Sequence, residues 1–255
     1  MKRTLPFGET SLFLDLDGTL APFAERPEAV GPDAARNDRL RRLADRLDGR
    51  LAIVSGRGLD DLDRILEGSV AALAGIHGLQ RRNAGAVVAA AAHAQLDEVV
   101  RELHAFSVRT PGTQVELKPL SAVLHYRGAP EAEADVRVFG ERLAARTGLK
   151  PQRGSMVLEF LTPGSDKGEA IRAFMQEPPF SGTVPLFAGD DLTDEDGFHA
   201  AIELGGFGVL VGPPRPTWAA FCLPDEACVH AWLEQALSLN AFVLEAPVES
   251  SYRRI

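Results

Sequence analysis

The sequence predicts an α/β fold, in which a Rossmann-like parallel sheet forms the core and a second, α+β domain is inserted into it. Two apolar runs that end in acidic residues, at 12–14 and 184–189, are typical of parallel strands buried on both faces. Between them, residues 84–163 break the alternation of strand and helix. We therefore expect a core at 1–83 and 164–255 and an inserted domain at 84–163.

The first predicted strand ends in a pair of carboxylates, within Asp15-Leu-Asp17-Gly-Thr19. Asp15 and Asp17 are expected on the same side at the carboxyl end of the strand, where open α/β sheets bind ligands. Two facing carboxylates repel each other, and a Mg2+ ion with oxygen ligands would relieve the repulsion. For this motif taken alone, a hairpin turn with a solvated Asp15 is the alternative.

A second strand is predicted at 51–54, after a Pro-containing loop at 21–27 and a helix that ends at Gly49. The helix is indicated by the spacing of Leu40, Leu43 and Leu47. Because a strand, a helix and a parallel strand form a right-handed unit, residues that follow 51–54 reach the same sheet edge as Asp15.

Ser55-Gly56-Arg57 follows this second strand. The Ser55 hydroxyl and the Gly56 amide are suited to hold phosphate oxygens. Arg57 either binds phosphate or pairs with Asp60 or Asp61, and the sequence leaves both open. A helix at 59–66 and a strand at 70–74 then lead to His77, which either contacts a ligand or is hydrogen-bonded within its loop.

The inserted domain reads as two helix–strand–strand units with an antiparallel sheet. The expected helices are 93–107 and 130–147, and the expected strands are 113–118, 121–126, 149–153 and 156–161.

The core resumes with a helix that has Ile171, Phe174 and Met175 on one face, with Asp166 or Ser165 as its N-cap. Lys167 falls in the first turn, where the helix dipole disfavours a cation, so an anionic partner is expected nearby.

Five carboxylates lie within 190–196. Thr193 is expected to cap a helix whose first turn holds the later acids, but capping does not explain Asp190 and Asp191, so metal ligation is the better account of Asp190. A strand at 207–211 and a helix at 225–237 complete the core. Residues 240–255 show no usable pattern.

Composition limits the possible partners. The net charge of −9 argues against nucleic-acid or membrane-surface binding. No apolar run approaches the ~18 residues of a membrane span, and the first residues lack a secretory apolar region, so we expect a cytoplasmic protein. We also expect the protein to be a monomer. Two cysteines, Cys222 and Cys228, are expected to be buried thiols. Only four of the 27 basic residues are lysines, among them Lys118 and Lys167.

Taken together, the motifs resemble those of the haloacid dehalogenase superfamily, in its order: Asp-x-Asp-Gly-Thr at 15–19, Ser-Gly at 55–56, Lys167 before a helix, and Gly-Asp-Asp-x-x-Asp at 189–194. The inserted domain resembles the cap of its sugar-phosphatase branch. Segments 115–118, 124–127, 154–159 and 163–168 closely resemble the trehalose-6-phosphate phosphatase family, although Gln80 stands where that family often has Glu.

The resemblance implies a Mg2+-dependent phosphatase that converts trehalose 6-phosphate to trehalose through an aspartyl-phosphate. It implies catalysis by Asp15, Asp17 and Lys167, and phosphate binding by Ser55, Gly56, Arg57 and Lys167. It also implies metal binding at Asp15, Asp17, Asp190, Asp191 and Asp194, and sugar binding by Glu116, Lys118, His125, Arg127 and Glu159. The alternatives are a phosphatase or phosphomutase for another sugar phosphate, or a catalytically silent sugar-phosphate sensor.

Overall fold

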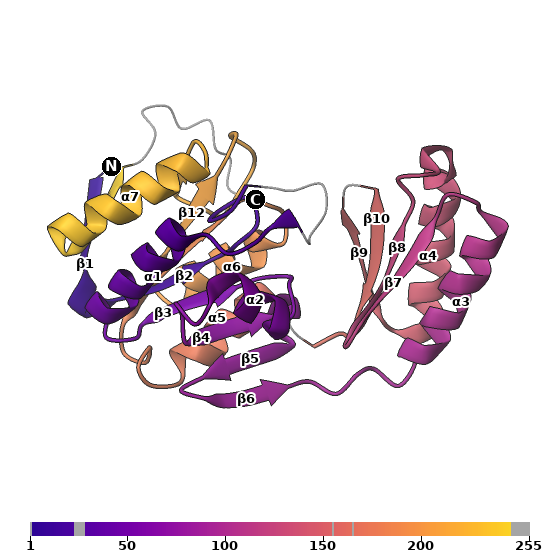
Figure 1. The fold of residues 1–255 in the computed structure, drawn as a ribbon, viewed down its shortest axis with the longest axis horizontal. Coiled ribbons are helices and arrows are strands. Elements are labelled where there is room, and N and C mark those ends of the chain that lie inside the picture. The colour runs from indigo at the N-terminus through magenta and orange to yellow at the C-terminus, as the bar shows by residue number, and fades with distance from the viewer. Residues whose placement is uncertain (1, 23–28, 155, 165, 246–255) are drawn as a thin grey trace. The chain divides into compact units, whose positions relative to one another are not determined.

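The computed structural model describes residues 2–22, 29–154, 156–164 and 166–245. The chain divides into a core unit, Met1–Ala89 with Ser165–Ile255, and an inserted unit, Ala90–Gly164 (Figure 1). The core unit extends beyond residue 83 because β5 (Gln80–Asn83) and β6 (Ala86–Ala89) form an antiparallel hairpin at the edge of the core sheet. Most of the loop expected at 21–27 lies outside the described residues.

The core sheet has eight strands in the order β13-β12-β11-β2-β3-β4-β5-β6. The six from β13 to β4 are parallel, and the hairpin is antiparallel. This arrangement confirms the predicted Rossmann-like α/β core. The parallel strands are β2 (Thr10–Leu14), β3 (Leu51–Val54), β4 (Ala72–Gly75), β11 (Val184–Gly189), β12 (Phe207–Val211) and β13 (Phe221–Leu223).

Helices cover both faces of this sheet (Figure 1). One layer holds α1 (Ala34–Arg46), α2 (Leu59–Leu66) and α7 (Glu226–Leu239), and the other holds α5 (Lys167–Met175) and α6 (Asp194–Glu203). Side chains alternate along β2, so Leu12 and Leu14 enter the first layer's core and Phe13 enters the second. Each fully buried side chain of this size stabilises the fold by about 1.5–3 kcal/mol.

A second small sheet was not expected from the sequence. β1 (Lys2–Pro6) pairs antiparallel with β14 (Ala241–Glu245), beside the short helix η1 (Phe7–Glu9). The Phe7 and Phe242 rings lie 4.9 Å apart, and the Trp232 indole donates a hydrogen bond to the Val243 carbonyl at 3.0 Å. These contacts join the two chain segments to α7.

The inserted unit contains the two helix–strand–strand repeats in the predicted order. Its elements are α3 (Leu96–Arg109), β7 (Gln114–Lys118), β8 (Ser121–His125), η4 (Pro130–Ala132), α4 (Glu133–Thr147), β9 (Lys150–Gly154) and β10 (Val157–Leu161). The antiparallel sheet has the order β7-β8-β10-β9. Leu124, Leu158 and Phe160 form a core with residues of both helices. One face of the sheet is therefore committed to packing.

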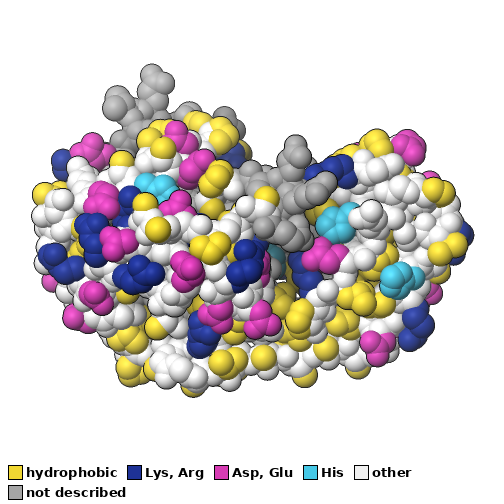
Figure 2. Space-filling model, in the orientation of Figure 1, with side chains coloured by type: hydrophobic (Ala, Val, Ile, Leu, Met, Phe, Trp, Pro, Cys, Tyr) yellow, Lys and Arg dark blue, Asp and Glu magenta, His cyan; other side chains and the backbone are white. Residues whose placement is uncertain are grey.

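Acidic and basic side chains are interspersed over the core unit on the face that Figure 2 shows. Within the described ranges, no helix is long and apolar enough to cross a lipid bilayer. Cys222 and Cys228 form no disulfide and are half-buried, so the expectation of buried thiols was wrong. Cys222 lies on the short edge strand β13, and Cys228 lies in the first turn of α7.

Candidate active site

Three polar segments follow the carboxyl ends of adjacent parallel strands. Asp15 follows β2, Ser55 follows β3 and Asp190 follows β11. The Asp15 amide donates to the Ala188 carbonyl, and the Ser55 amide donates to the Ala74 carbonyl, each at 2.9 Å. The sheet ladder thus continues to Asp15 and Ser55 and fixes the backbone of these two segments.

Lys167 lies between two buried carboxylates. Its Nζ is 3.0 Å from Asp15 Oδ1 and donates to Asp194 Oδ1 at 2.6 Å, and the three side chains are at most 6% exposed. Burial would lower the pKa of Lys167, but Asp15 and Asp194 outweigh it and raise that pKa. An anionic partner was expected near Lys167 at the start of its helix, and the structure provides two, Asp15 and Asp194.

Asp166 holds the helix that carries Lys167. Its side chain accepts a hydrogen bond from the Glu169 amide at 2.9 Å, which confirms Asp166 as the N-cap. The other candidate, Ser165, lies outside the described residues. A capped first turn orients Lys167 from a fixed backbone.

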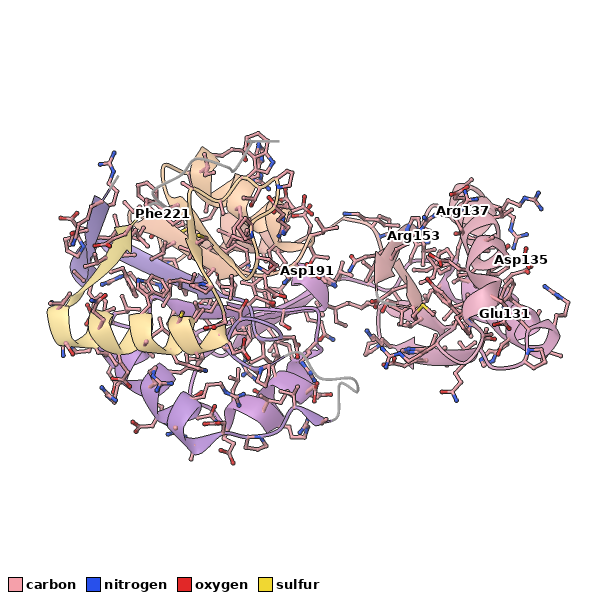
Figure 3. The ribbon with its side chains drawn as sticks, turned by 90° about the horizontal axis from the view of Figure 1, so that it is seen from above. Glu131, Asp135, Arg137, Arg153, Asp191 and Phe221 are labelled. Carbon is pink, nitrogen blue, oxygen red and sulfur yellow. The ribbon has the colours of Figure 1, made fainter. Side chains whose placement is uncertain are left out.

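The acidic loop after β11 is organised by Asp194. Its Oδ2 accepts hydrogen bonds from the amides of Asp190 and Asp191, each at 2.9 Å. Asp191, labelled in Figure 3, accepts instead from the Thr193 hydroxyl at 2.6 Å. Thr193 occupies the N-cap position of α6 and the later acids lie in its first turn, as predicted, but the Thr193 side chain makes no capping hydrogen bond. Its hydroxyl is used by Asp191, and Asp194 holds the loop amides.

Gly18 is required by the approach of Asp190. The glycine has φ +79°, and a Cβ built there would overlap the Asp190 carboxylate. A side chain at position 18 would therefore push away an acidic group of the site.

The acid cluster fits a divalent cation. Carboxylate oxygens of Asp15, Asp190 and Asp194 all lie within 4.8 Å of one another. Burial, with Asp194 and Asp191 nearby, raises the pKa of Asp190 to about 7. Burial also raises the pKa of Asp15, against the opposing effect of Lys167. One ammonium does not neutralise these carboxylates, and hard oxygen donors of this kind suit Mg2+.

The Ser55–Gly56 loop is tied to the residues that follow β4. Ile76 and His77, within η3 (Ile76–Gly78), both have positive φ values, 48° and 53°. The His77 amide donates to the Ser55 carbonyl at 3.0 Å. A Cβ at Gly56 would lie 2.9 Å from His77 Nε2. The strained turn therefore holds the imidazole against Gly56, which has room for it because glycine lacks a side chain.

Arg57 contacts two carboxylates. Its guanidinium donates to both oxygens of Asp17, Nε to Oδ2 and Nη2 to Oδ1, each at 2.7 Å. Nη1 donates to Asp61 on α2. Burial lowers the pKa of Arg57, but its hydrogen bonds to the Asp17 and Asp61 carboxylates outweigh this effect and raise that pKa. The sequence left Asp60 and Asp61 open as partners of Arg57, and the described contacts include Asp61 but not Asp60. The pairing of Arg57 with Asp17 was not anticipated.

Four of the five predicted sugar-binding residues lie on the face of the inserted sheet opposite its helices. Glu116, Val123 and Glu159 are register partners across β7, β8 and β10, so their side chains share one face. His125 Nε2 lies 2.8 Å from Glu116 Oε2, and Lys118 Nζ donates to Glu159 Oε1 at 3.2 Å.

Buried Ser121 also donates to Glu159 Oε1, at 2.6 Å. Arg127 is outside this group, because it lies beyond the end of β8 and is exposed.

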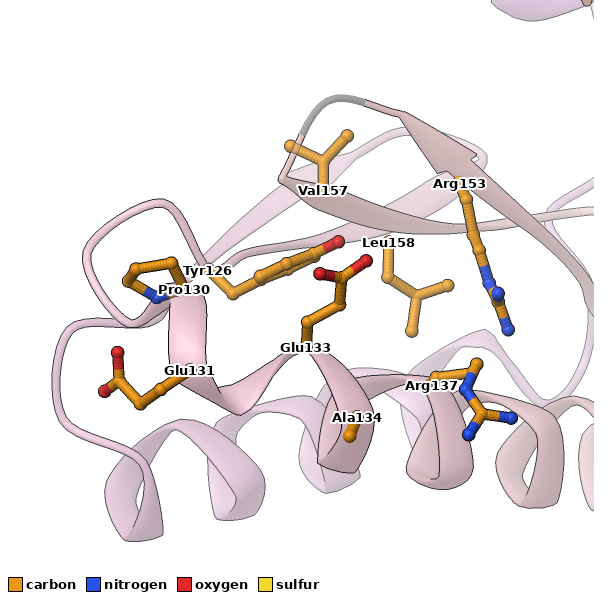
Figure 4. Close-up of a pocket in the computed structure, with 9 residues that line it drawn as sticks. All are labelled: Tyr126, Pro130, Glu131, Glu133, Ala134, Arg137, Arg153, Val157 and Leu158. Carbon is orange, nitrogen blue, oxygen red and sulfur yellow. The ribbon is translucent and has the colours of Figure 1, made fainter.

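The inserted unit also has a pocket of about 390 Å³, which is distinct from the group of predicted sugar-binding residues (Figure 4). Tyr126 and Glu133 line one part of it, and Arg137 and Arg153 line another. None of the predicted sugar-binding residues lines this pocket.

Arg215 and Thr19 support the acidic loop and were missed in the sequence. Arg215 Nη2 donates to the carbonyl of Asp191 at 2.6 Å and approaches that of Asp190 at 3.3 Å. The Thr19 hydroxyl lies 3.4 Å from Asp190 Oδ1. Arg215 stands in a Pro-rich loop far along the chain, and no spacing rule connects it to residue 190.

Comparison with known proteins identifies the family of this chain. A family model described as trehalose-phosphatase matches residues 13–214. The chain is 39% identical over 231 residues to the trehalose-6-phosphate phosphatase of Escherichia coli, covering 87% of this chain and 84% of that protein. It is 38% identical over 234 residues to a probable trehalose-phosphate phosphatase of Sinorhizobium fredii, covering 90% and 88%.

Solved structures show the same fold. A trehalose-6-phosphate phosphatase related protein matches with a TM-score of 0.75 and 27% identity, over 89% of this chain and 97% of that one. The C-terminal domain of the Candida albicans trehalose-6-phosphate phosphatase matches with a TM-score of 0.79 and 23% identity, over 91% and 93%. The chain therefore belongs to the trehalose-phosphatase family of enzymes.

Proposed function

We propose that this enzyme is a Mg2+-dependent phosphomonoesterase that hydrolyses trehalose 6-phosphate to trehalose and phosphate. One observation carries the proposal: the buried Asp15 carboxylate lies 3.0 Å from Lys167 and within 4.8 Å of Asp190 and Asp194. A nucleophile in this setting can meet a phosphate dianion, because cations around it offset the repulsion between the two.

In the proposed reaction, Asp15 attacks phosphorus and forms an aspartyl-phosphate, which divides one difficult displacement into two easier steps. Asp17 protonates the departing sugar oxygen and then takes a proton from the hydrolytic water. Lys167, the Ser55 hydroxyl and the Gly56 amide hold the transferring oxygens.

Asp15 and Asp190, with the Asp17 carbonyl, would hold the Mg2+ ion. Asp194 is better suited to support, because both its oxygens already accept hydrogen bonds from Lys167 and the loop amides. Asp191 is likewise assigned a supporting role. The bound ion would neutralise negative charge on the nucleophile and the phosphate.

Sugar recognition is assigned to the polar face of the inserted sheet, at Glu116, Lys118, His125 and Glu159. Ionised groups make strong hydrogen bonds to hydroxyls, and these four are already paired with one another in fixed positions. Sugar binding by Arg127 and phosphate binding by Arg57 stay predictions of the family resemblance. The cytoplasmic location and the monomeric state stay predictions made from the sequence.

Phosphate release from trehalose 6-phosphate, sucrose 6-phosphate and glucose 6-phosphate, with Mg2+ and with chelator, tests the proposal. We expect Mg2+-dependent release that strongly prefers trehalose 6-phosphate. Preference for another sugar phosphate would establish a different phosphatase, and transfer without release would establish a mutase. Binding without turnover of any of the three would establish a sensor.

A further inference from the structure

Asp17, the general acid assigned to the reaction, forms a bidentate pair with the guanidinium of Arg57. Two parallel N–H···O bonds of 2.7 Å join Arg57 to both oxygens of Asp17. The Arg57 side chain is 9% exposed and that of Asp17 is 27% exposed. A bidentate pair fixes the plane of a carboxylate as well as its distance, which a single hydrogen bond does not do.

Arg57 is itself held from several directions. Nη1 donates to Asp61, whose other oxygen accepts from Arg64. The Arg57 amide donates to Ser55 Oγ at 3.2 Å, and its carbonyl accepts from the Ile76 amide at 2.8 Å. The guanidinium therefore has a fixed origin, on the same backbone turn that presents Ser55.

From this geometry, and resting on the proposed function, we infer that Arg57 is a positioning residue for Asp17, through the bidentate pair that sets the orientation of the Asp17 carboxylate. Proton transfer to the departing oxygen and from the hydrolytic water depends on direction and reach, so a carboxyl group that rotates freely gives up and takes up the proton less effectively. Arg57 acts on the proton-transfer steps and not as a phosphate ligand. Its contribution should therefore follow how much a substrate needs protonation of its leaving group.

The test compares leaving groups. A sugar alkoxide needs a proton to depart, whereas p-nitrophenolate departs without one. We expect Arg57→Gln to lower kcat/KM roughly 10- to 100-fold for trehalose 6-phosphate, within the range of general acid catalysis, and only about 3-fold or less for p-nitrophenyl phosphate. A series of substituted phenyl phosphates should show a steeper dependence of kcat/KM on phenol pKa in the variant.

A double-mutant cycle with Asp17→Asn separates the two roles of Arg57. If Arg57 acts through Asp17, adding Arg57→Gln to Asp17→Asn should cost little more, because the oriented group is already absent. Additive losses, with equal loss for every leaving group and weaker inhibition by inorganic phosphate, would establish phosphate binding and overturn the inference.

Arg57→Lys provides a second variant, with the charge kept and the fork removed. We expect it to show the same leaving-group signature with a smaller loss; near-unmodified kinetics would show that charge alone suffices and would also overturn the inference. Arg82→Gln is the matched control, since Arg82 also forms a two-bond pair with a carboxylate of α2, that of Asp63, but makes no described contact with Asp17 or Asp61. It should change neither leaving-group slope nor kcat/KM appreciably.

The proposed substrate and the positioning role of Arg57 can fail independently of each other. If the unmodified protein hydrolyses aryl phosphates but not trehalose 6-phosphate, the proposed substrate is wrong, while the aryl series still measures the role of Arg57. If it hydrolyses trehalose 6-phosphate and Arg57→Gln loses activity equally on all substrates, the proposed function stands and the positioning role is excluded. Thermal melts of each variant identify a loss that arises from misfolding, in which case Arg57→Lys decides.

Discussion

The Lys167 ammonium and the Asp15 carboxylate lie 3.0 Å apart, with side chains only 3% and 6% exposed. A buried ion pair of this kind is costly to break from one side, because the remaining charge has no partner and little water. The pair therefore links the stability of the core unit to its proposed chemistry.

Replacement of Asp15 tests the nucleophile. We expect Asp15→Asn to bind trehalose 6-phosphate yet release phosphate at least roughly 1000-fold more slowly, because an amide does not form the acyl-phosphate. Phosphate release and substrate binding by calorimetry measure the two properties separately. Turnover near the unmodified rate would contradict the covalent mechanism.

Loss of Lys167 should weaken both fold and activity. Lys167→Met leaves Asp15 and Asp194 facing each other without the ammonium, and we expect a destabilisation of roughly 3–5 kcal/mol, as for other buried pairs broken from one side. Urea unfolding with and without Mg2+ measures it. Since a divalent cation offsets the same carboxylates, Mg2+ should stabilise the variant more than the unmodified protein, and an equal effect would count against a metal at this site.

The raised pKa of Asp190 predicts that the free energy of unfolding of the metal-free protein depends on pH and that a bound metal ion changes this dependence. Its pKa is raised to about 7, so the folded metal-free protein loses the corresponding stability as pH rises from the unfolded value near 3.8 through about 7. Asp190→Asn avoids this loss, and we expect it to stabilise the metal-free protein by roughly 1–3 kcal/mol at pH 8, with little difference near pH 4.

Thermal melts across this pH range, repeated with Mg2+, provide the measurement for Asp190. The ion should raise the melting temperature of the unmodified protein and have much less effect on Asp190→Asn. A variant that is less stable than the unmodified protein at pH 8 without metal would show that Asp190 is not under electrostatic strain.

Glu177 joins the edge hairpin to the loop after α5. Both of its oxygens accept from Arg81, each at 2.7 Å, and hydrogen bonds from Arg81 and Asn83 lower the pKa of Glu177 to about 2. Its contribution is complete above the unfolded value near 4.5 and is lost as pH falls through about 2. Because the side chain is 41% exposed, we expect Glu177→Gln to cost only about 1 kcal/mol at pH 7.

The Glu177 effect is measured by urea unfolding at pH 7 and at pH 3, where the difference between variant and unmodified protein should shrink. Glu169→Gln on α5 is the control, since Glu169 pairs with Arg172 within one helix and is more exposed. A Glu177→Gln effect that stays constant with pH would mean that packing, and not ionisation, carries it.

Glu116 tests the assignment of sugar recognition. Glu116→Ala should lower kcat/KM for trehalose 6-phosphate by roughly 10-fold or more, since a charged hydrogen-bond partner of the sugar is lost, and leave p-nitrophenyl phosphate hydrolysis nearly unchanged. Glu141→Ala, an exposed acidic residue of α4, serves as the control. Equal losses of Glu116→Ala on both substrates would remove the recognition role.

The order of strands and helices could be predicted because apolar runs, helical spacing and turn residues are local features of the sequence. Leu12-Phe13-Leu14 had to lie between two layers, and a strand, helix and parallel strand bring Asp15 and Ser55 to one edge by chirality alone. Strands without such a pattern were missed, as at Gln80–Asn83, where four consecutive polar residues are half-buried by their neighbours in the sheet.

The pairing of side chains was decided only by the tertiary structure. Sequence alone determined which acids reach the sheet edge, because backbone topology places them there. It did not determine that Arg57 faces Asp17, that Asp194 holds the amides of Asp190 and Asp191, or that Arg215 holds the loop from beyond β12. Those contacts join residues that are distant in sequence through side-chain directions set by packing, and no local propensity or spacing records them.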